Sequence, residues 1–220
     1  MPPLRASFHE RLAALRQDLV HMGDLASQSI GRCLELLATR DVSLAAQVQQ
    51  IEDEIDRLNM DIERRALELL ATQQPMARDL RVIASVLKAI GDIERIGDYC
   101  VDMAKQAVML SAKPLFKPLV DIPRMAELVR TMLQETLEAF AREDVRRGLA
   151  AVEKDHQVDA LYRQLHEEIS GYLQRDPALA DQAIRLLMIG TSLERMADHV
   201  TNIGERIWYM ETGQLKELHE

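Results

Sequence analysis

Carboxylate side chains recur four positions apart at corresponding places in the two halves of the chain. The set in the first half comprises Glu52, Asp56, Glu94, Asp98 and Asp102. The set in the second half, about 100 residues further on, comprises Asp155, Asp159, Glu194 and Asp198, with the amide Asn202 in the place of the fifth acid. A spacing of four places two side chains on one helix face, with Cβ atoms about 6 Å apart. Oxygen ligands from two facing helices suit hard cations, so the pattern predicts metal-binding sites.

The place of these acids in the apolar pattern strengthens this prediction. In the first half the series Ile83, Leu87 and Ile90 continues at Glu94, with Gly97 leaving space beside it. We therefore expect Glu94 to occupy a core-facing position, and the same holds for its counterpart in the second half. A buried carboxylate needs a hydrogen-bonding partner or a cation. Because the pattern occurs twice, a metal ion is the favoured partner.

Ordinary salt bridges within each helix offer an alternative explanation. Arg95 precedes Asp98 by three residues, and Arg195 precedes Asp198 by the same spacing. Such pairs usually mark a solvated helix face. On spacing alone, both explanations stay open.

Apolar residues recur with a helical period along nearly the whole chain. Pro75 and Pro177 interrupt the pattern, because proline disfavours a helical conformation in the residue before it. Three further prolines between residues 113 and 123 predict a linker. We expect helices over residues 4–39, about 48–72, 80–111, 123–142, 145–174 and 178–212.

The order long helix, long helix, proline, long helix therefore occurs twice. Short connections make successive helices antiparallel neighbours. The predicted fold is all-α, with two tandem three-helix up-down-up bundles related by a pseudo-repeat. The expected boundaries are residues 1–113 for the first bundle, 114–122 for a proline-rich linker and 123–220 for the second bundle.

Composition excludes several classes of protein. A net charge of −9 and 4% aromatic residues argue against nucleic-acid binding, which needs a basic face. No apolar run approaches the roughly 18 residues of a membrane span, and no signal peptide is evident. Cys33 and Cys100 are far apart and are predicted to be reduced, buried thiols. A cytoplasmic protein without direct membrane insertion is expected.

Common catalytic signatures are absent, including G-x-x-x-x-G-K-[ST], G-x-S-x-G and H-E-x-x-H. Glu153 and His156 have the spacing of a di-iron motif, but that site requires a second copy, which the chain lacks. His156 and His199 adjoin motif acids, yet lie about 100° around the helix from them. We interpret both histidines as surface or outer residues and expect no enzymatic activity.

The acidic motifs also carry a family resemblance that extends over essentially the full chain. Residues 92–98 (DIERIGD), 193–203 (LERMADHVTNI) and 75–81 (PMARDLR) resemble the signature strings of the PhoU family of phosphate-uptake regulators. The upstream acidic pairs fit the same family. Two departures are Asn202, where the family has an acid, and Ala197, where it has a glycine.

The resemblance implies a negative regulator of phosphate uptake and of phosphate-starvation signalling. It implies contacts with the ATPase of a phosphate ABC transporter and with a phosphate-sensing histidine kinase, and self-association, at least as a homodimer. It also implies multinuclear iron, or another divalent metal among Zn, Mg, Mn and Ca, held by the two acidic sets.

Three hypotheses follow. The first is a non-catalytic regulator whose acidic helix faces hold metal and contact protein partners. The second is an enzyme with a carboxylate-bridged metal cluster, which would need an open coordination position. The third is a metal-free helical scaffold, for which an ion pair between Arg95 and Asp98 is the expected arrangement.

Overall fold

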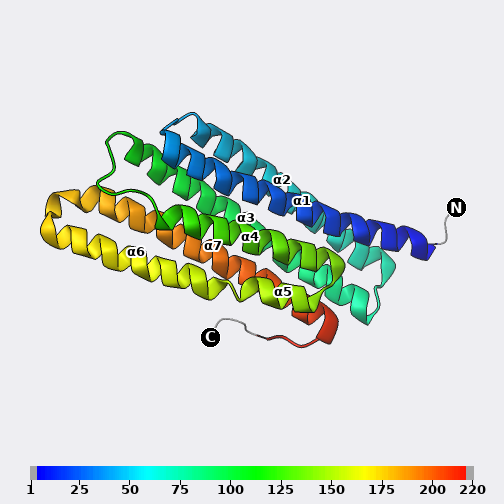
Figure 1. Cartoon of the computed structure of the whole chain (residues 1–220). Helices are drawn as coiled ribbons and strands as arrows, with labels where there is room; N and C mark the ends of the chain where they lie inside the picture. The colour runs from blue at the N-terminus through cyan, green and yellow to red at the C-terminus, as the bar shows by residue number, and fades with distance from the viewer. Residues whose placement is uncertain (1–3, 217–220) are drawn as a thin grey trace.

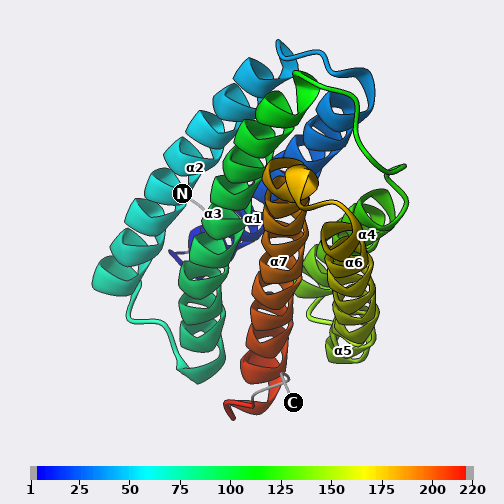
Figure 2. The same cartoon turned by 90° about the vertical axis from the view of Figure 1, so that its left-hand side faces the viewer.

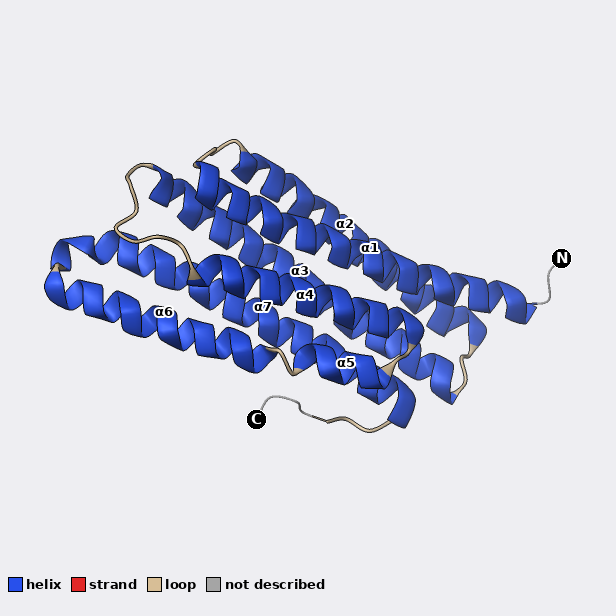
Figure 3. Cartoon of the chain, viewed as in Figure 1, coloured by secondary structure: helices blue, strands red, loops and turns tan. Residues whose placement is uncertain are grey.

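The computed structural model describes residues 4–216, and all regular secondary structure in this range is helical. The predicted all-α fold is confirmed (Figure 3). The elements in chain order are α1 (Leu4–Thr39), α2 (Leu44–Gln73), α3 (Ala77–Ser111), α4 (Asp121–Arg142), α5 (Val145–Val152), α6 (Asp155–Arg175), the 3₁₀ turn η1 (Pro177–Leu179) and α7 (Ala180–Thr212). None of the helices in the described range is long and apolar enough to cross a membrane.

The helices run roughly lengthwise through the molecule (Figure 1). The first three pack against one another, and α7 packs against α4, α5 and α6. The two groups meet mainly where α3 lies along α7, with a further contact between α1 and α4. Seen from the end, α2, α3, α7 and α6 form one face, with α1 and α4 behind them (Figure 2).

Helix ends follow local chemistry. Gln74 takes a left-handed conformation (φ 45°) after α2, and Pro75 follows it. Gly213 ends α7 with φ 72°, which glycine adopts without steric cost. The Asp144 carboxylate accepts a hydrogen bond from the Arg147 backbone N–H at 3.0 Å and caps α5.

The predicted single helix over residues 145–174 is wrong, because a turn at 153–154 divides it into α5 and α6. The break lets α5 pack very closely on α7. A Cβ atom at Gly204 would lie 2.6 Å from Val152 Cγ1, and one at Gly148 would lie 2.8 Å from Ile207 Cδ1. Neither proline nor glycine stands at the break, so the local sequence gives no signal for it.

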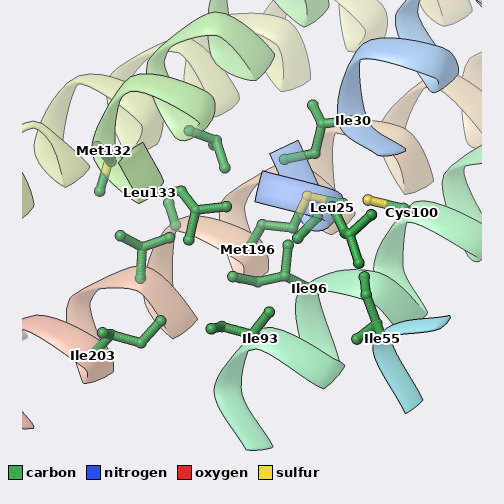
Figure 4. Packing of buried hydrophobic residues seen from close by; sticks show 14 of the residues in the cluster. Leu25, Ile30, Ile55, Ile93, Ile96, Cys100, Met132, Leu133, Met196 and Ile203 are labelled. Atoms are coloured by element: carbon green, nitrogen blue, oxygen red, sulfur yellow. The ribbon is translucent and has the colours of Figure 1, made fainter. Parts of the chain in front are cut away.

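One hydrophobic cluster extends through both groups of helices (Figure 4). Ile96 on α3 and Met196 on α7 are fully buried near its centre. Glycine permits a close approach elsewhere, since a Cβ atom at Gly23 of α1 would lie 1.9 Å from Leu137 Cδ1 of α4. The core therefore binds the two repeats into one packed unit.

Polar contacts fix the register of α3 against α7. Arg81 Nε donates to the Met210 carbonyl at 3.0 Å, and Ser85 Oγ donates to the Arg206 carbonyl at 3.3 Å. Nearer the other end of α3, Arg185 Nη1 of α7 donates to Gln106 Oε1 at 3.1 Å. As the residue number rises along α3, the number of the contacting residue on α7 falls by the same amount. The two helices are antiparallel, and their centre lies near residues 96 and 196.

The segment before α4 is held by a buried ion pair. The Lys117 side chain is 3% exposed and pairs with Glu168 of α6 and with Asp121, whose oxygen is 3.5 Å away. The Phe116 ring packs edge-on against Tyr172, with centroids 5.0 Å apart. Because α4 begins at Asp121, it takes in the end of the predicted linker; the division at 114–122 stays a prediction.

The two cysteines lie between α1 and α3 and are both buried and unpaired, as predicted. Cys33 Sγ donates to the Cys100 carbonyl at 3.2 Å. Its hydrogen bond with the Cys100 side chain and its burial raise the pKa of the Cys33 thiol.

Candidate metal centre

The structure brings the first acidic set together between α2 and α3. Burial raises the pKa of Glu52, and the negative charges of Asp56 and of Asp98 on the facing helix raise it further. Burial, Asp98 and Asp56 likewise raise the pKa of Glu94, whereas Arg95 lowers it. Repulsion between carboxylates therefore acts across the two helices, which places the acids of α2 and α3 in the same region of the molecule. An open depression of about 410 Å³ lies beside them.

Gly97 explains how α2 can lie so close to α3 at this point. A Cβ atom on Gly97 would be 3.3 Å from Ile55 Cδ1 and 3.8 Å from Glu52 Cγ. A larger residue would push the α2 carboxylates away from those of α3. In the second half Ala197 occupies the equivalent position and is buried.

The second acidic set meets in the same way between α6 and α7. Burial raises the pKa of Glu194, and Asp198, Asp159 and Asp155 raise it further through their negative charges. All four acids belong to the two predicted pairs, Asp155 with Asp159 on α6 and Glu194 with Asp198 on α7. Both predicted sets are therefore spatial clusters.

The prediction that Glu94 occupies a core-facing position is wrong. Its side chain is 25% exposed, whereas Ile93, Ile96 and Gly97 are the buried residues of this part of α3. The buried face is wide because α3 packs against α1, α2 and α7 at once. The carboxylates lie at the edge of that face, where a helix meets both its neighbour and solvent.

Basic side chains pair with several acids of the first set. Arg95 Nη1 lies 2.9 Å from Asp98 Oδ2, and its Nε lies 3.5 Å from Glu94 Oε2. Lys105 Nζ lies 2.9 Å from Asp102 Oδ1. In the second half Tyr99 of α3 raises the pKa of the Arg195 guanidinium, and Glu194 and Asp198 raise it further.

The donor chemistry of both clusters fits a hard cation, because each gathers carboxylate oxygens whose mutual repulsion a cation would relieve. Their present geometry is not that of a formed site. Among the residues that the structure describes, no three His, Cys, Asp or Glu side chains converge to hold a metal ion. In the first cluster, a bound cation would have to displace Arg95 from the acids.

Sequence reasoning missed a polar contact between the two halves. Asp92 Oδ1 on α3 lies 2.9 Å from His199 Nδ1 and accepts a hydrogen bond from Asn202 Nδ2 at 3.2 Å. The ring of His199 also packs against Tyr99, with centroids 5.8 Å apart. At the position equivalent to Asp92 the second half has Ser192, so the repeat pattern could not have revealed this contact.

The fold and the site define a class of protein in which a helical bundle is duplicated and each copy carries an acidic cluster on two adjacent helices. The PhoU domain matches the chain twice, over residues 19–107 and 122–207. The chain belongs to the PhoU family.

Relatives support this assignment over nearly the whole chain. The phosphate-specific transport system accessory protein PhoU homolog of Caulobacter vibrioides is 35% identical over 94% of this chain and 91% of its own length. The homolog of Deinococcus radiodurans is 33% identical over 96% of this chain and 99% of its own.

Solved structures agree. The crystal structure of PhoU from Pseudomonas aeruginosa has a TM-score of 0.90 and 33% identity, over 94% of this chain and all of that one. The phosphate transport system regulatory protein PhoU from Streptococcus pneumoniae has a TM-score of 0.89 and 31% identity, over 96% of this chain and all of that one.

Proposed function

We propose that this protein is a non-catalytic accessory protein that negatively regulates phosphate uptake and phosphate-starvation signalling. The observation that carries the proposal is the full-length match to relatives named for the phosphate transport system, with both repeats included. The regulatory protein from Streptococcus pneumoniae, which shares the fold, carries a name of the same meaning.

Regulation in this proposal acts through protein contacts made in the cytoplasm. The partners are the ATPase of the phosphate ABC transporter and the phosphate-sensing histidine kinase, and the protein self-associates as a homodimer. The two acidic clusters, one between α2 and α3 and one between α6 and α7, offer negatively charged groups for such contacts.

Deletion of the gene tests the regulatory role. Phosphate uptake by phosphate-replete cells should rise in the deletion strain, and expression of the intact chain should return uptake to its original rate. Copurification from the same cells should recover the transporter ATPase or the kinase. Unchanged uptake in the deletion strain would overturn the proposal.

The metal part of the proposal is that each acidic cluster holds a divalent cation, with iron, zinc, manganese, magnesium and calcium as candidates. A bound cation would supply positive charge that neutralises the carboxylates and draws α2 to α3 and α6 to α7. Elemental analysis of the purified protein tests this directly. The double variant Glu94→Ala with Asp98→Ala should hold less metal than the unaltered chain, and equal content would refute the idea.

A metal-free scaffold is the second candidate, and the ion pairs of Arg95 favour it. The guanidinium already balances part of the charge of Glu94 and Asp98. This alternative predicts that the purified chain contains no stoichiometric metal and gains no thermal stability from added divalent cations.

A further inference from the structure

A groove of about 440 Å³ lies at the end of the bundle where α1 ends and the connecting segment 112–120 leads from α3 to α4 (toward the left in Figure 1). We call it the linker groove. Its apolar lining comprises Leu37, Ala38, Pro114, Leu115, Pro118 and Leu119. Val120, next to this lining, is 54% exposed. A hollow with apolar walls that is open to solvent is typical of a binding surface.

Two basic side chains also line the linker groove, and only one of them has its charge balanced within the chain. Lys117 is buried in ion pairs with Asp121 and Glu168. Arg40 is exposed, and its side chain forms no ion pair or hydrogen bond within the part of the chain that the structure describes. The neighbouring carboxylate of Asp41 instead accepts the backbone N–H two residues further on, at 3.0 Å. The groove therefore presents a free positive charge, although the chain as a whole carries −9.

Arg40 occupies a backbone position that favours glycine. It directly follows α1 with φ 63°, a left-handed conformation that glycine usually supplies at helix ends. Glu143 takes the equivalent place after α4, with φ 54°, and its carboxylate pairs with Arg16 and Arg78. In the second half, the long side chain at this position therefore makes a contact inside the molecule. An arginine at the strained position of the first half is explained if its guanidinium binds a group outside the chain.

The undescribed residues of the sequence are too far away to fill the linker groove. Gln182, near the start of α7, donates from Nε2 to the Pro114 carbonyl at 3.0 Å, whereas Lys216 Nζ lies 5.3 Å from the Trp208 ring near the other end of that helix. These two places are about 40 Å apart along α7, and residues 217–220 extend over at most about 14 Å. Residues 1–3 precede α1, and the groove lies at its opposite end, about 50 Å along the helix. Another molecule is therefore the expected occupant.

We propose that the linker groove binds a segment of a partner protein in which an apolar side chain stands next to an aspartate or a glutamate. The apolar side chain fills the space between α1 and segment 112–120, and the carboxylate forms a bidentate ion pair with Arg40. Lys113, which is exposed and adjoins the lining residue Pro114, adds a second positive charge nearby.

The linker groove is opposite in charge to the two acidic clusters, so it selects a different kind of partner surface. The inference goes beyond the proposed function, because it needs neither a metal ion nor the acidic clusters. A protein that regulates by contact would then have two recognition surfaces, one for basic and one for acidic segments.

A library of random dodecapeptides displayed on phage, selected on the purified intact chain, tests the proposal. Fluorescence anisotropy then measures the affinity of the selected peptides for the intact chain and for the variants Arg40→Gly, Ala38→Trp and Arg175→Gln. Arg40→Gly removes the charge and leaves a residue that suits the backbone there. Ala38 is exposed, so tryptophan at this position fills the groove from outside the core. Arg175 is the matched control, because it is also an exposed arginine at a helix end but does not line the groove.

The selected peptides should share an Asp or Glu beside a Leu, Phe or Trp. They should bind Arg40→Gly at least about tenfold more weakly, which corresponds to the loss of a hydrogen bond between charged groups. Ala38→Trp should weaken binding as well, whereas Arg175→Gln should bind like the intact chain. The melting temperature of Arg40→Gly should equal or exceed that of the intact chain, which separates a lost contact from a lost fold.

Three results would overturn the inference. They are a selection that yields no acidic peptide, equal affinity of the acidic peptides for the intact chain and Arg40→Gly, and unchanged binding to Ala38→Trp. None of them bears on phosphate uptake by the deletion strain, so the inference and the proposed function can fail separately.

Discussion

Replacing Glu94 by glutamine should change the stability of the protein in opposite directions with and without metal. Without metal, burial raises the pKa of Glu94, and repulsion from Asp98 one turn along α3 and from Asp56 on α2 raises it further. A like-charge pair at this spacing lowers the stability by about 0.2–0.5 kcal/mol. Attraction to Arg95, whose Nε lies 3.5 Å from Glu94 Oε2, offsets a similar amount. After both effects, Glu94→Gln should stabilise the metal-free protein by about 0.5 kcal/mol, since two acids outweigh one arginine.

A saturating cation reverses the sign of the stability change that Glu94→Gln causes. A ligand at 100 times its Kd stabilises the folded state by about 2.7 kcal/mol, and a variant with a 100-fold weaker site would retain about 0.4 kcal/mol. The variant should therefore be less stable than the unaltered chain by roughly 2 kcal/mol. For a chain of this size the two changes correspond to about +1–2 °C and about −4–8 °C in melting temperature.

Differential scanning calorimetry in EDTA and in excess Ca²⁺ measures both changes. The pH dependence gives an internal check in EDTA. Because the folded-state pKa of Glu94 lies above its unfolded value, the ionised carboxylate destabilises the fold, and stability falls as pH rises through that pKa. The advantage of Glu94→Gln should therefore be present at neutral pH and vanish once Glu94 is protonated. A change of the same sign in both buffers would refute the reasoning.

Three further predictions concern the packing of the bundle. Gly23→Ala should destabilise the fold by about 1–3 kcal/mol, because its Cβ would enter the contact between α1 and α4. Gly91→Ala, which has open space around it, should stabilise the fold by up to about 1 kcal/mol. Urea unfolding measures both changes. Lys117→Met should lower the free energy of unfolding by about 3 kcal/mol, because it leaves the buried carboxylate of Asp121 without its cation. A loss under about 1 kcal/mol in the same assay would contradict this. Cys33 and Cys100 should resist a thiol reagent in the native protein and react fully in denaturant; rapid native labelling would show that α1 and α3 open readily.

The helices and most of their ends could be predicted because the apolar period and the prolines act locally. The period also identified both acidic sets, whose carboxylates raise one another's pKa across adjacent helices; their role as metal ligands stays a prediction. The break after Val152 was not predictable, since it depends on the close fit of α5 against Gly204 of α7. Contacts of this kind exist only once distant helices have met.

The exact face that each helix buries was also beyond the local pattern. Glu94 fits an apolar series counted from Ile83, but α3 has three helical neighbours and its buried face is centred nearer Ile93. The contact between Asp92 and His199 depends on the register of α3 against α7, which no repeat in the sequence encodes.

The antiparallel packing of α3 on α7 has a consequence for how such a chain can arise and be divided. The two helices occupy equivalent places in the repeat and pack about a common centre. The surface that each half contributes to the interface is therefore nearly the same. A half expressed alone would expose this apolar face and would find its complement in a second identical half. Joining two copies in one chain turns that encounter into an intramolecular one at millimolar effective concentration. Once joined, the copies are free to diverge at single positions such as 92 and 192, which a symmetric pair of identical halves could not do.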